Sequence, residues 1–384
     1  MGISGFVRVT HCREWGSDLS QSTRELGARA PESGSRPIPV SVGLRYPWWR
    51  LVAAAAVVLL LAIFAVSRGS VGIPPVTVAK ILASKLPFLD PIADWPATSE
   101  TILMQLRLPR VVLAGIVGAA LATSGAAYQG LFKNPLADPY LIGVASGAGL
   151  GATIVLITGV PLMVGTLSLL PIAAFAGGLG AVSLAYMIAR RSSETPLSTL
   201  ILAGVAIASL AGAVTSLLMV RSDPDLRPLL SWLLGGFISA RWSHSAVVLM
   251  YLVPAAALLA GYGRILNVLQ LDEDHAAQLG VSVERTKLLL VGSATLATAA
   301  AVSFSGLIGF VGLVAPHVVR LTWGGDYRFL LPMSALVGAG FLILADLVAR
   351  TIVSPAELPV GIVTAFCGAP FFLYLLRKRS TVGL

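Results

Sequence analysis

The chain of 384 residues is too apolar for a water-soluble globule, because 56% of its residues are hydrophobic, 12% are charged and the mean hydropathy is +0.85. Its formal charge is +9, but Lys and Arg stand at the ends of apolar runs and form no continuous basic stripe, so nucleic acid is not an expected partner. No run alternates polar with apolar residues, which excludes a transmembrane β-barrel. We therefore predict an all-α polytopic protein that has membrane lipid around it.

Residues 1–45 are rich in Ser, Arg, Gly and Pro and lack the apolar core of a signal peptide, so a disordered cytoplasmic tail is predicted there. Residues 46–380 are predicted to form the membrane domain. Cys12 and Cys367 lie far apart and have no metal-ligand spacing, so neither a metal site nor a bound cofactor is expected.

Apolar stretches that suit membrane helices, which need about 20 residues, recur along the domain, although several are short or broken by Gly and Pro. Short positive clusters, among them Arg190 with Arg191 and residues 377–379, fall on the side of the tail. The positive-inside rule then places both termini in the cytoplasm. We predict ten spans, at residues 48–66, 108–131, 141–160, 162–189, 197–220, 243–263, 288–304, 307–319, 329–349 and 359–376.

Two external segments are predicted to be only partly helical. Residues 69–100 contain several prolines and acids, with a short helix expected near 76–86. Residues 222–240 are too short and too punctuated to cross a bilayer, and Asp223 is a suitable N-cap for a short helix there. The apolar side chains of this helix could fold over a pore mouth or simply pack in the core; they include Leu229, Trp232, Leu233 and Phe237.

A polar island at residues 264–287 separates two apolar spans on the cytoplasmic side. Asp272, Glu273 and Asp274 favour the positive end of a helix dipole, and Gly280 can end a short helix in a left-handed conformation. A soluble partner could push on such a helix, which would suggest a driven transporter. An ordinary solvated loop with one helical turn is the alternative.

Six arginines do not obey the charge rule, because the same topology places them outside. A ring of guanidinium groups around an external mouth could receive an acidic protein surface or an anionic solute. Isolated arginines could instead extend to lipid phosphates. The six are Arg107, Arg110, Arg221, Arg227, Arg241 and Arg350.

Several motifs, in order from about Trp48 to the C-terminus, resemble the FecCD family of ABC-importer permeases. They are Leu-Arg-Leu-Pro-Arg at 106–110, Gly-Leu-Phe-Lys-Asn-Pro-Leu-Ala-Asp-Pro at 130–139, the Leu279-Gly280 island, Ile-Gly-Phe-Val-Gly-Leu-Val-Ala-Pro-His at 308–317, Ala-Asp-Leu-Val-Ala-Arg at 345–350 and Glu-Leu-Pro-Val-Gly at 357–361. The resemblance implies the ten-helix fold of a type II importer permease in a bacterial or archaeal cytoplasmic membrane. Its partners would be a second permease copy, two ATP-binding subunits that use ATP and Mg, and a periplasmic or lipoprotein substrate-binding protein.

The resemblance also implies roles for particular residues. Arg107, Arg110 and Arg350 look like the external arginines that grip acidic residues of the binding protein. The fifth and tenth spans and the short external helix would line the pathway. The coupling segment received by the ATPase would comprise Leu271, Asp272, Glu273, Asp274, His275, Ala276, Ala277, Gln278, Leu279, Gly280 and Val281. Among the cargoes of this family, we rank an iron-siderophore first for this chain, cobalamin second and haem third.

An ion-coupled secondary transporter and a membrane enzyme are the two alternatives. Ion-coupled carriers place acidic or His residues within spans, whereas Asp346, the clearest intramembrane acid, is four residues from Arg350 and can form a helical pair with it. The histidines fall at the tail, the interfaces and the cytoplasmic loop, so no catalytic residue is expected. The chain has no phosphate-binding Gly-x-x-x-x-Gly-Lys-Ser/Thr loop, so ATP hydrolysis would belong to a separate subunit.

Overall fold

The computed structural model describes residues 48–69, 72–85, 94–158, 163–164, 167–190, 194–221 and 226–381. These residues belong to the second of two compact units, Pro47–Leu384. The predicted tail, residues 1–45, lies outside the described residues.

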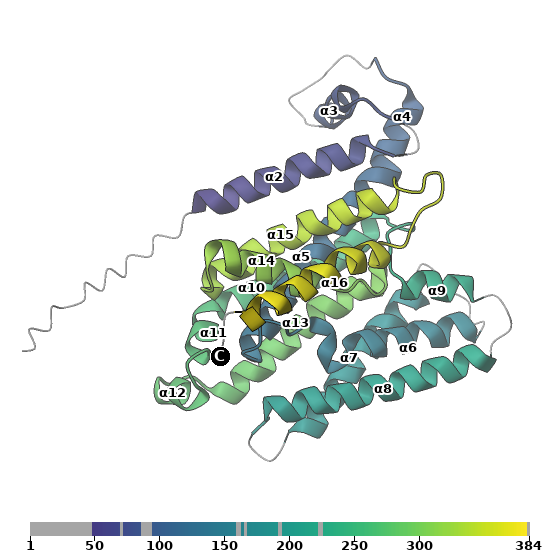
Figure 1. The fold of residues 1–384 in the computed structure, drawn as a ribbon. Coiled ribbons are helices and arrows are strands. Elements are labelled where there is room, and N and C mark those ends of the chain that lie inside the picture. Colours follow the sequence, from purple (N-terminus) through teal and green to yellow (C-terminus); the bar gives the residue numbers. More distant parts are fainter. Residues whose placement is uncertain are drawn as a thin grey trace, which may run out of the picture. The chain divides into compact units, whose positions relative to one another are not determined.

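Each of the ten predicted spans corresponds to one helix, so the all-α membrane fold is confirmed (Figure 1). Seven described helices are long and apolar enough to cross a bilayer, α6 and α16 offer shorter apolar stretches, and α14 has 13 residues. The ten are α2 (Trp48–Ser67), α5 (Leu108–Leu131), α6 (Val144–Ile157), α7 (Leu169–Ala189), α8 (Leu197–Arg221), α10 (Trp242–Gly261), α13 (Val283–Ser305), α14 (Val311–Trp323), α15 (Tyr327–Ala349) and α16 (Val360–Thr381).

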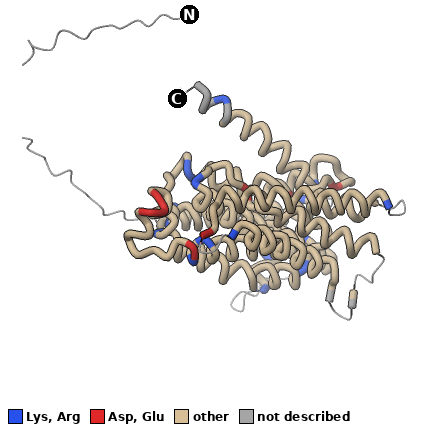
Figure 2. Tube along the Cα trace, turned by 90° about the horizontal axis from the view of Figure 1, so that it is seen from below, with Lys and Arg blue, Asp and Glu red and all other residues tan. Residues whose placement is uncertain are grey.

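The short elements lie at the two ends of the bundle, which we call the α3 end and the α12 end (Figure 1). The α3 end carries α3 (Pro75–Ala83), α4 (Ala97–Thr101) and α9 (Arg227–Leu233). The α12 end carries α11 (Gly263–Leu269) and α12 (Glu273–Gln278), together with the beginning of α2 and the end of α16. Charged residues are sparse along the helices between these ends, as expected for segments that face lipid (Figure 2).

The connections contain three further elements. A 3-10 turn, η2 (Pro139–Ile142), precedes α6, and Asp138 caps it by accepting a hydrogen bond from the Tyr140 amide. The two-stranded antiparallel hairpin β1 (Met163–Val164) and β2 (Leu167–Ser168) precedes α7, with Met163 opposite Ser168. The fourth predicted span, at 162–189, is therefore helical only from Leu169 onwards within the described residues.

Helix α5 is the centre of the bundle. The most apolar window of the continuous helical segment Ala97–Leu131 is 83% buried, against 17% for α2. Small residues make this possible, because they allow two backbones to approach closely. A Cβ on Gly118 would collide with the Gly338 carbonyl of α15, and one on Gly125 with the Gly312 carbonyl of α14.

The beginning of α5 differs from the prediction. The chain is already helical from Ala97, through α4 and the π-helical turn η1 (Ile102–Arg107), so the predicted external loop ends earlier than expected. Pro109 offers a physical reason for the wider turn, since proline has no N–H to bond the carbonyl four residues before it. The turn brings Arg107 and Arg110 to the α3 end of the bundle.

Backbone hydrogen bonds join three places in the chain: the end of α9, the end of α13 with the connection to α14, and the start of α16. We call this meeting point the backbone junction. The Gly236 amide donates to the Ser305 carbonyl at 2.8 Å, the Val360 amide to the Gly235 carbonyl at 2.9 Å, and the Gly361 amide to the Leu234 carbonyl at 3.1 Å. Tyr140 adds a side-chain bond, because its hydroxyl donates to the Ile308 carbonyl at 3.0 Å. The junction thus fixes α9 against α13 and α16.

Candidate functional site

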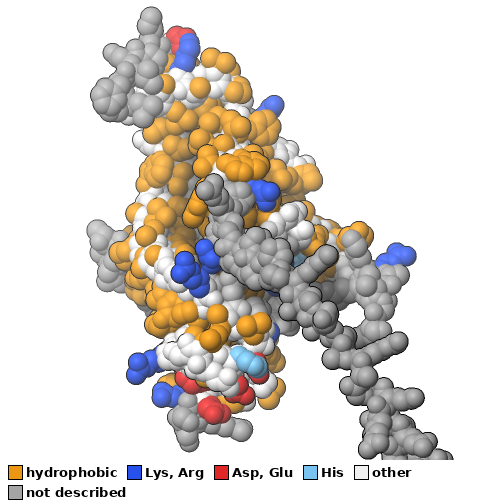
Figure 3. Space-filling view, turned by 90° about the vertical axis from the view of Figure 1, so that its left-hand side faces the viewer, with side chains coloured by type: hydrophobic (Ala, Val, Ile, Leu, Met, Phe, Trp, Pro, Cys, Tyr) orange, Lys and Arg blue, Asp and Glu red, His pale blue; other side chains and the backbone are white. Residues whose placement is uncertain are grey.

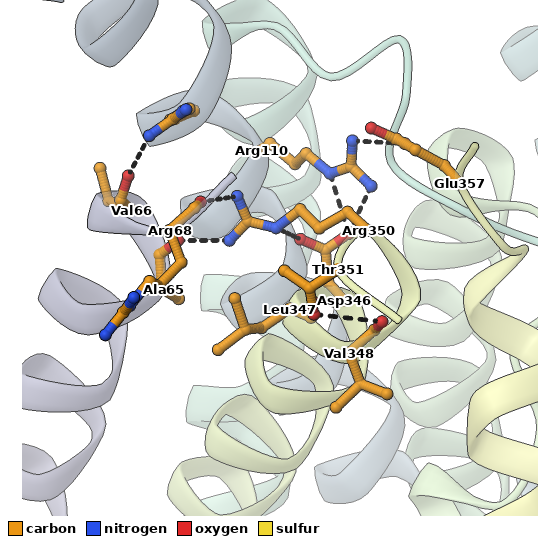
Figure 4. Close-up of polar contacts among 11 residues, drawn as sticks. Ala65, Val66, Arg68, Arg110, Asp346, Leu347, Val348, Arg350, Thr351 and Glu357 are labelled. Atoms are coloured by element: carbon orange, nitrogen blue, oxygen red, sulfur yellow. Dashed lines mark hydrogen bonds and ion pairs between the residues drawn. The ribbon is translucent and has the colours of Figure 1, made fainter. Parts of the chain in front are cut away.

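Arginines from three elements gather at the α3 end (Figure 4). Arg107 ends η1, Arg110 lies in the first turn of α5, and Arg350 follows the last turn of α15. We call these three the arginine cluster. The long-range packing of α5 against α15 brings together residues that are more than 200 positions apart in the sequence.

The carboxylate of Asp346 holds the cluster together. Its side chain is fully buried, and Arg110 meets its Oδ1 with Nε at 2.9 Å and with a terminal nitrogen at 2.8 Å. Arg350 Nε lies 3.3 Å from Oδ2, which confirms the predicted pairing of positions 346 and 350. The other terminal nitrogen of Arg110 donates to Glu357 at 2.8 Å. Two guanidinium groups therefore face two carboxylates.

Arg350 is also directed toward the end of α2 (Figure 4), and Arg107 forms a hydrogen bond there too. Arg107 donates to the carbonyl of Val66 at 3.2 Å, and Arg350 donates to the carbonyls of Arg68, at 2.9 Å, and Ala65. The last carbonyls of a helix have no partner within the helix and carry partial negative charge, so cations stabilise them. Both arginines thereby attach the end of α2 to the rest of the bundle.

The arginine cluster also borders open space. A recess of about 350 Å³ is lined by all three arginines, Glu357, Ile238 and other residues. Arg110 keeps 12% of its side chain exposed there, while Arg107 and Arg350 are buried. The sequence predicted that the three arginines lie at one end of the bundle; it did not predict that they share a recess or that Glu357 takes part.

Helix α12 forms at the predicted place and has the predicted ends. Asp272 precedes the helix and accepts a hydrogen bond from the Glu273 amide at 2.7 Å. Gly280 has φ +82°, and the amides of Gly280 and Val281 donate to the carbonyls of Ala277 and Ala276. This pair of bonds is the Schellman arrangement that ends a helix at a left-handed glycine.

Helix α12 presents an exposed surface. It buries Ala276, whereas the flanking Leu271 and Leu279 are 73% and 68% exposed. In Figure 3, acidic side chains and a histidine gather at the lower end of a face that is otherwise largely hydrophobic. The two exposed leucines give this end of the molecule apolar area that is available to a partner.

Helix α11, which the sequence did not predict, holds this surface to the bundle. The Asn267 amide nitrogen donates to Asp326 at 2.7 Å, and its oxygen accepts from the Tyr327 amide at 2.9 Å. Gln270 donates to the Gly130 carbonyl at the end of α5 at 2.7 Å. The island is therefore fixed to the ends of α5 and α15.

The predicted pathway residues divide into two groups. Trp232 and Phe237 line a cavity of about 400 Å³ that also reaches Arg110, Glu357 and Val360. Leu229 is buried, and Leu233 packs on α6 near Gly149, so these two contribute to packing. Helix α9 begins at Arg227 after Leu226, and the predicted cap, Asp223, lies outside the described residues.

The helical bundle, with an arginine recess at one end and an exposed acidic helix at the other, defines a multi-pass membrane protein. The family model of the FecCD transport family matches residues 40–378. The chain belongs to the FecCD transport family.

Two relatives and one solved structure illustrate this membership. The chain is 50% identical over 289 residues to the cobalamin import system permease protein of Halobacterium salinarum, covering 75% of this chain and 77% of that protein. It is 44% identical to the hemin transport system permease protein of Yersinia pestis, covering 73% and 84%. A transporter assigned to the metal-chelate type of ABC transporter, in an inward-facing conformation, matches with a TM-score of 0.75 and 32% identity, over 86% of this chain and 99% of that one.

Proposed function

We propose that this chain is the permease subunit of an ATP-binding-cassette importer that moves a metal chelate across the cytoplasmic membrane. The observation that carries the proposal is family membership over residues 40–378, combined with a fold similar to a metal-chelate type transporter. ATP and Mg would be used by two separate ATPase subunits. We prefer this function to that of an ion-coupled carrier, because two relatives are permease proteins of a cobalamin import system and a hemin transport system.

The α12 end is the proposed cytoplasmic face. The exposed Leu271 and Leu279 offer apolar contacts to an ATPase, and the acidic residues around Asp272 offer charge complementarity. Because α11 fixes the segment to α5 and α15, force on the segment reaches the bundle core.

The α3 end is the proposed external face, where a substrate-binding protein would dock. The recess at the arginine cluster supports this assignment, since a carboxylate that enters it meets guanidinium groups in a restricted space. A single pair at the rim of an interface contributes about 0 to 1 kcal/mol, so the arginines would orient the partner more than hold it.

Docking should therefore depend on Arg110 more than on other cations at the same end. Replacing Arg110 with Glu places a third carboxylate beside Asp346 and Glu357, and we expect the affinity for the binding protein to fall at least about tenfold. Arg241→Glu is the matched control, because Arg241 is exposed and lies outside the lining of the recess. Surface plasmon resonance measures both affinities, and retained ATPase binding reports a folded permease. Equal affinities for the two variants would contradict the docking assignment.

A homodimer is the proposed assembly, with α8 and α16 beside the pathway. Both helices leave apolar side chains exposed, including Leu210 and Leu217 on α8 and Phe366 and Leu373 on α16. Such faces can pack against a second copy or against lipid. Trp232 and Phe237, which line the neighbouring cavity, would border the solute pathway at its external end.

Cobalamin becomes the first cargo to test. The sequence analysis placed iron-siderophore first, but the relative with 50% identity is a cobalamin permease, and vitamin B12 permeases of Yersinia and Vibrio species are 40–42% identical. The haem permease at 44% identity makes haem the second choice.

The proposed function is tested in proteoliposomes that contain this chain with its ATPase, and with binding protein added outside. We expect ATP-dependent accumulation of cyanocobalamin that stops when the ATPase is omitted. Haem and a ferric siderophore, each offered with the same binding protein, distinguish the cargo classes. Accumulation by the chain alone against a gradient would refute the importer assignment and support an ion-coupled carrier.

A further inference from the structure

Lys287 is a buried cation near the beginning of α13, and its ammonium group contacts three separate elements. Only 5% of its side chain is exposed. Its Nζ donates to Glu273 of α12 at 2.8 Å, to Glu284 of its own helix at 2.9 Å, and to the carbonyl of Thr195 at 3.2 Å. Thr195 is itself buried and lies two residues before α8 begins. Lys287 therefore joins α12, α13 and the start of α8.

These contacts use the full donor capacity of the ammonium group, which has three N–H bonds. All three are charge-assisted because the donor is ionised, and such bonds are roughly twice as strong as neutral ones; the two to carboxylates are ion pairs as well. The pair with Glu284 lies within α13, so it cannot link elements. The pair with Glu273 joins α12 to α13, and a longer pair of 4.0 Å between Lys133 and Asp272 joins the cap of α12 to the end of α5.

This connection matters for α12 because the helix buries little of its own surface against the bundle. It is six residues long and buries Ala276, while the residues around it are exposed or half-buried. Displacement of α12 can reach the bundle along the chain on either side, through the packing of Ala276, or through ion pairs, of which Lys287–Glu273 at 2.8 Å is shorter than Lys133–Asp272 at 4.0 Å. Along the chain, α12 is connected to α13 through the turn at Gly280, which has φ +82°. The Lys287 pair bypasses that connection.

Helix α13 leads from Lys287 to the opposite end of the molecule. It runs from Val283 to Ser305, and 67% of its most apolar window is buried. The Ser305 carbonyl accepts from the Gly236 amide, so the far end of α13 belongs to the backbone junction that holds α9 and α16. The far end of α13 also borders the cavity lined by Trp232 and Phe237, since Phe304 and Ser305 line it too.

We propose that Lys287 is a positioning residue that transmits displacement of α12 to α13 and to the start of α8, and thereby couples the ATPase to opening of the pathway. This inference rests on the proposed function, since it presumes an ATPase on α12. It adds to that function the specific contact through which the force passes. The role requires the interhelical pair with Glu273, not the positive charge alone.

The test compares Lys287→Met, Lys287→Arg, Glu273→Gln and the double variant Lys287→Met with Glu273→Gln. Each is reconstituted with the ATPase and the binding protein, and cyanocobalamin imported per ATP hydrolysed is measured. We expect Lys287→Met and Glu273→Gln each to lower this ratio about tenfold, and ATPase binding to persist in Lys287→Met, whose altered side chain is buried. The double variant should be no worse than either single one, because both remove the same link. Lys287→Arg, which keeps a cation with several donors, should retain at least about half of the wild-type ratio.

Arg285→Met is the matched control, since Arg285 is an exposed cation two residues away on the same helix and should leave the ratio unchanged. Should Lys287→Met fail to fold, Glu273→Gln decides, because the Glu273 side chain is 38% exposed and its replacement leaves no buried cavity. The inference is overturned if the ratio is unchanged in Glu273→Gln, if the single effects add in the double variant, or if a folded Lys287→Met loses ATPase binding. A wild-type chain that binds no ATPase would instead refute the proposed function itself.

Discussion

Gly280→Pro is expected to abolish ATP-driven uptake while the ATPase still hydrolyses ATP. Gly280 has φ +82°, whereas proline is fixed near −65°, so the substitution forces a different path on the chain. It also removes the amide that donates to the Ala277 carbonyl at 2.9 Å. Without its Schellman ending, α12 would present Leu271 and Leu279 in a different orientation. Uptake and ATP hydrolysis, measured together in proteoliposomes, report the uncoupling.

Ser282→Pro is the control for this experiment. Ser282 lies two residues further along and has φ −74°, which proline adopts without strain. We expect near wild-type uptake from Ser282→Pro. If Gly280→Pro and Ser282→Pro transport equally well, the segment at residues 271–281 is not the coupling element.

Asp346→Asn is expected to destabilise the protein by about 3 kcal/mol or more, because removing one partner of a buried ion pair leaves an uncompensated charge. Asp346 is fully buried and faces both Arg110 and Arg350. Asparagine has nearly the same shape, so the loss reports charge more than packing. Arg350 would also lose the carboxylate that orients it toward the carbonyls at the end of α2. Thermal and denaturant unfolding in detergent measure the change.

Asp94→Asn removes the same charge from an exposed position. Asp94 is 56% exposed and pairs with Lys80, whose ammonium group holds the pKa of the Asp94 carboxyl below its ordinary value. Exposed pairs contribute about 0 to 1 kcal/mol, so this variant should unfold close to wild type. An Asp346→Asn protein as stable as Asp94→Asn would show that the carboxylate at 346 does not hold the arginine cluster together.

The helices themselves could be predicted from the sequence because lipid imposes one simple condition. A run of apolar residues must satisfy its backbone internally, so length and hydropathy locate the helix. The residues at which helices begin and end were harder to predict. The helix that contains α5 begins at Ala97 rather than near Leu108. Hydropathy did not reveal this start, because Ser99, Glu100 and Thr101 are polar although they belong to the same helix.

Contacts between residues far apart in the chain were harder to predict from the sequence than contacts within one helix. The pairing of Asp346 with Arg350 was predicted because helical spacing makes it local, whereas its pairing with Arg110 depends on how α5 packs on α15. The bonds from Arg107 and Arg350 to α2 end on backbone carbonyls, which every residue possesses. Lys287 offered one usable signal, its spacing of three from Glu284, but nothing in the sequence pointed to Glu273 or Thr195 as its other partners.

The backbone junction constrains how this chain can vary over time. Helix α14 has 13 residues and is about 20 Å long, so residues 306–310 must cover part of a hydrocarbon layer about 30 Å thick without regular helix. Such backbone is tolerated in a membrane only where protein groups satisfy it, as the Tyr140 hydroxyl does here by donating to the Ile308 carbonyl and accepting from the Ile308 amide. An inserted or deleted residue would shift every donor past its acceptor, so this stretch can exchange side chains but must conserve its length.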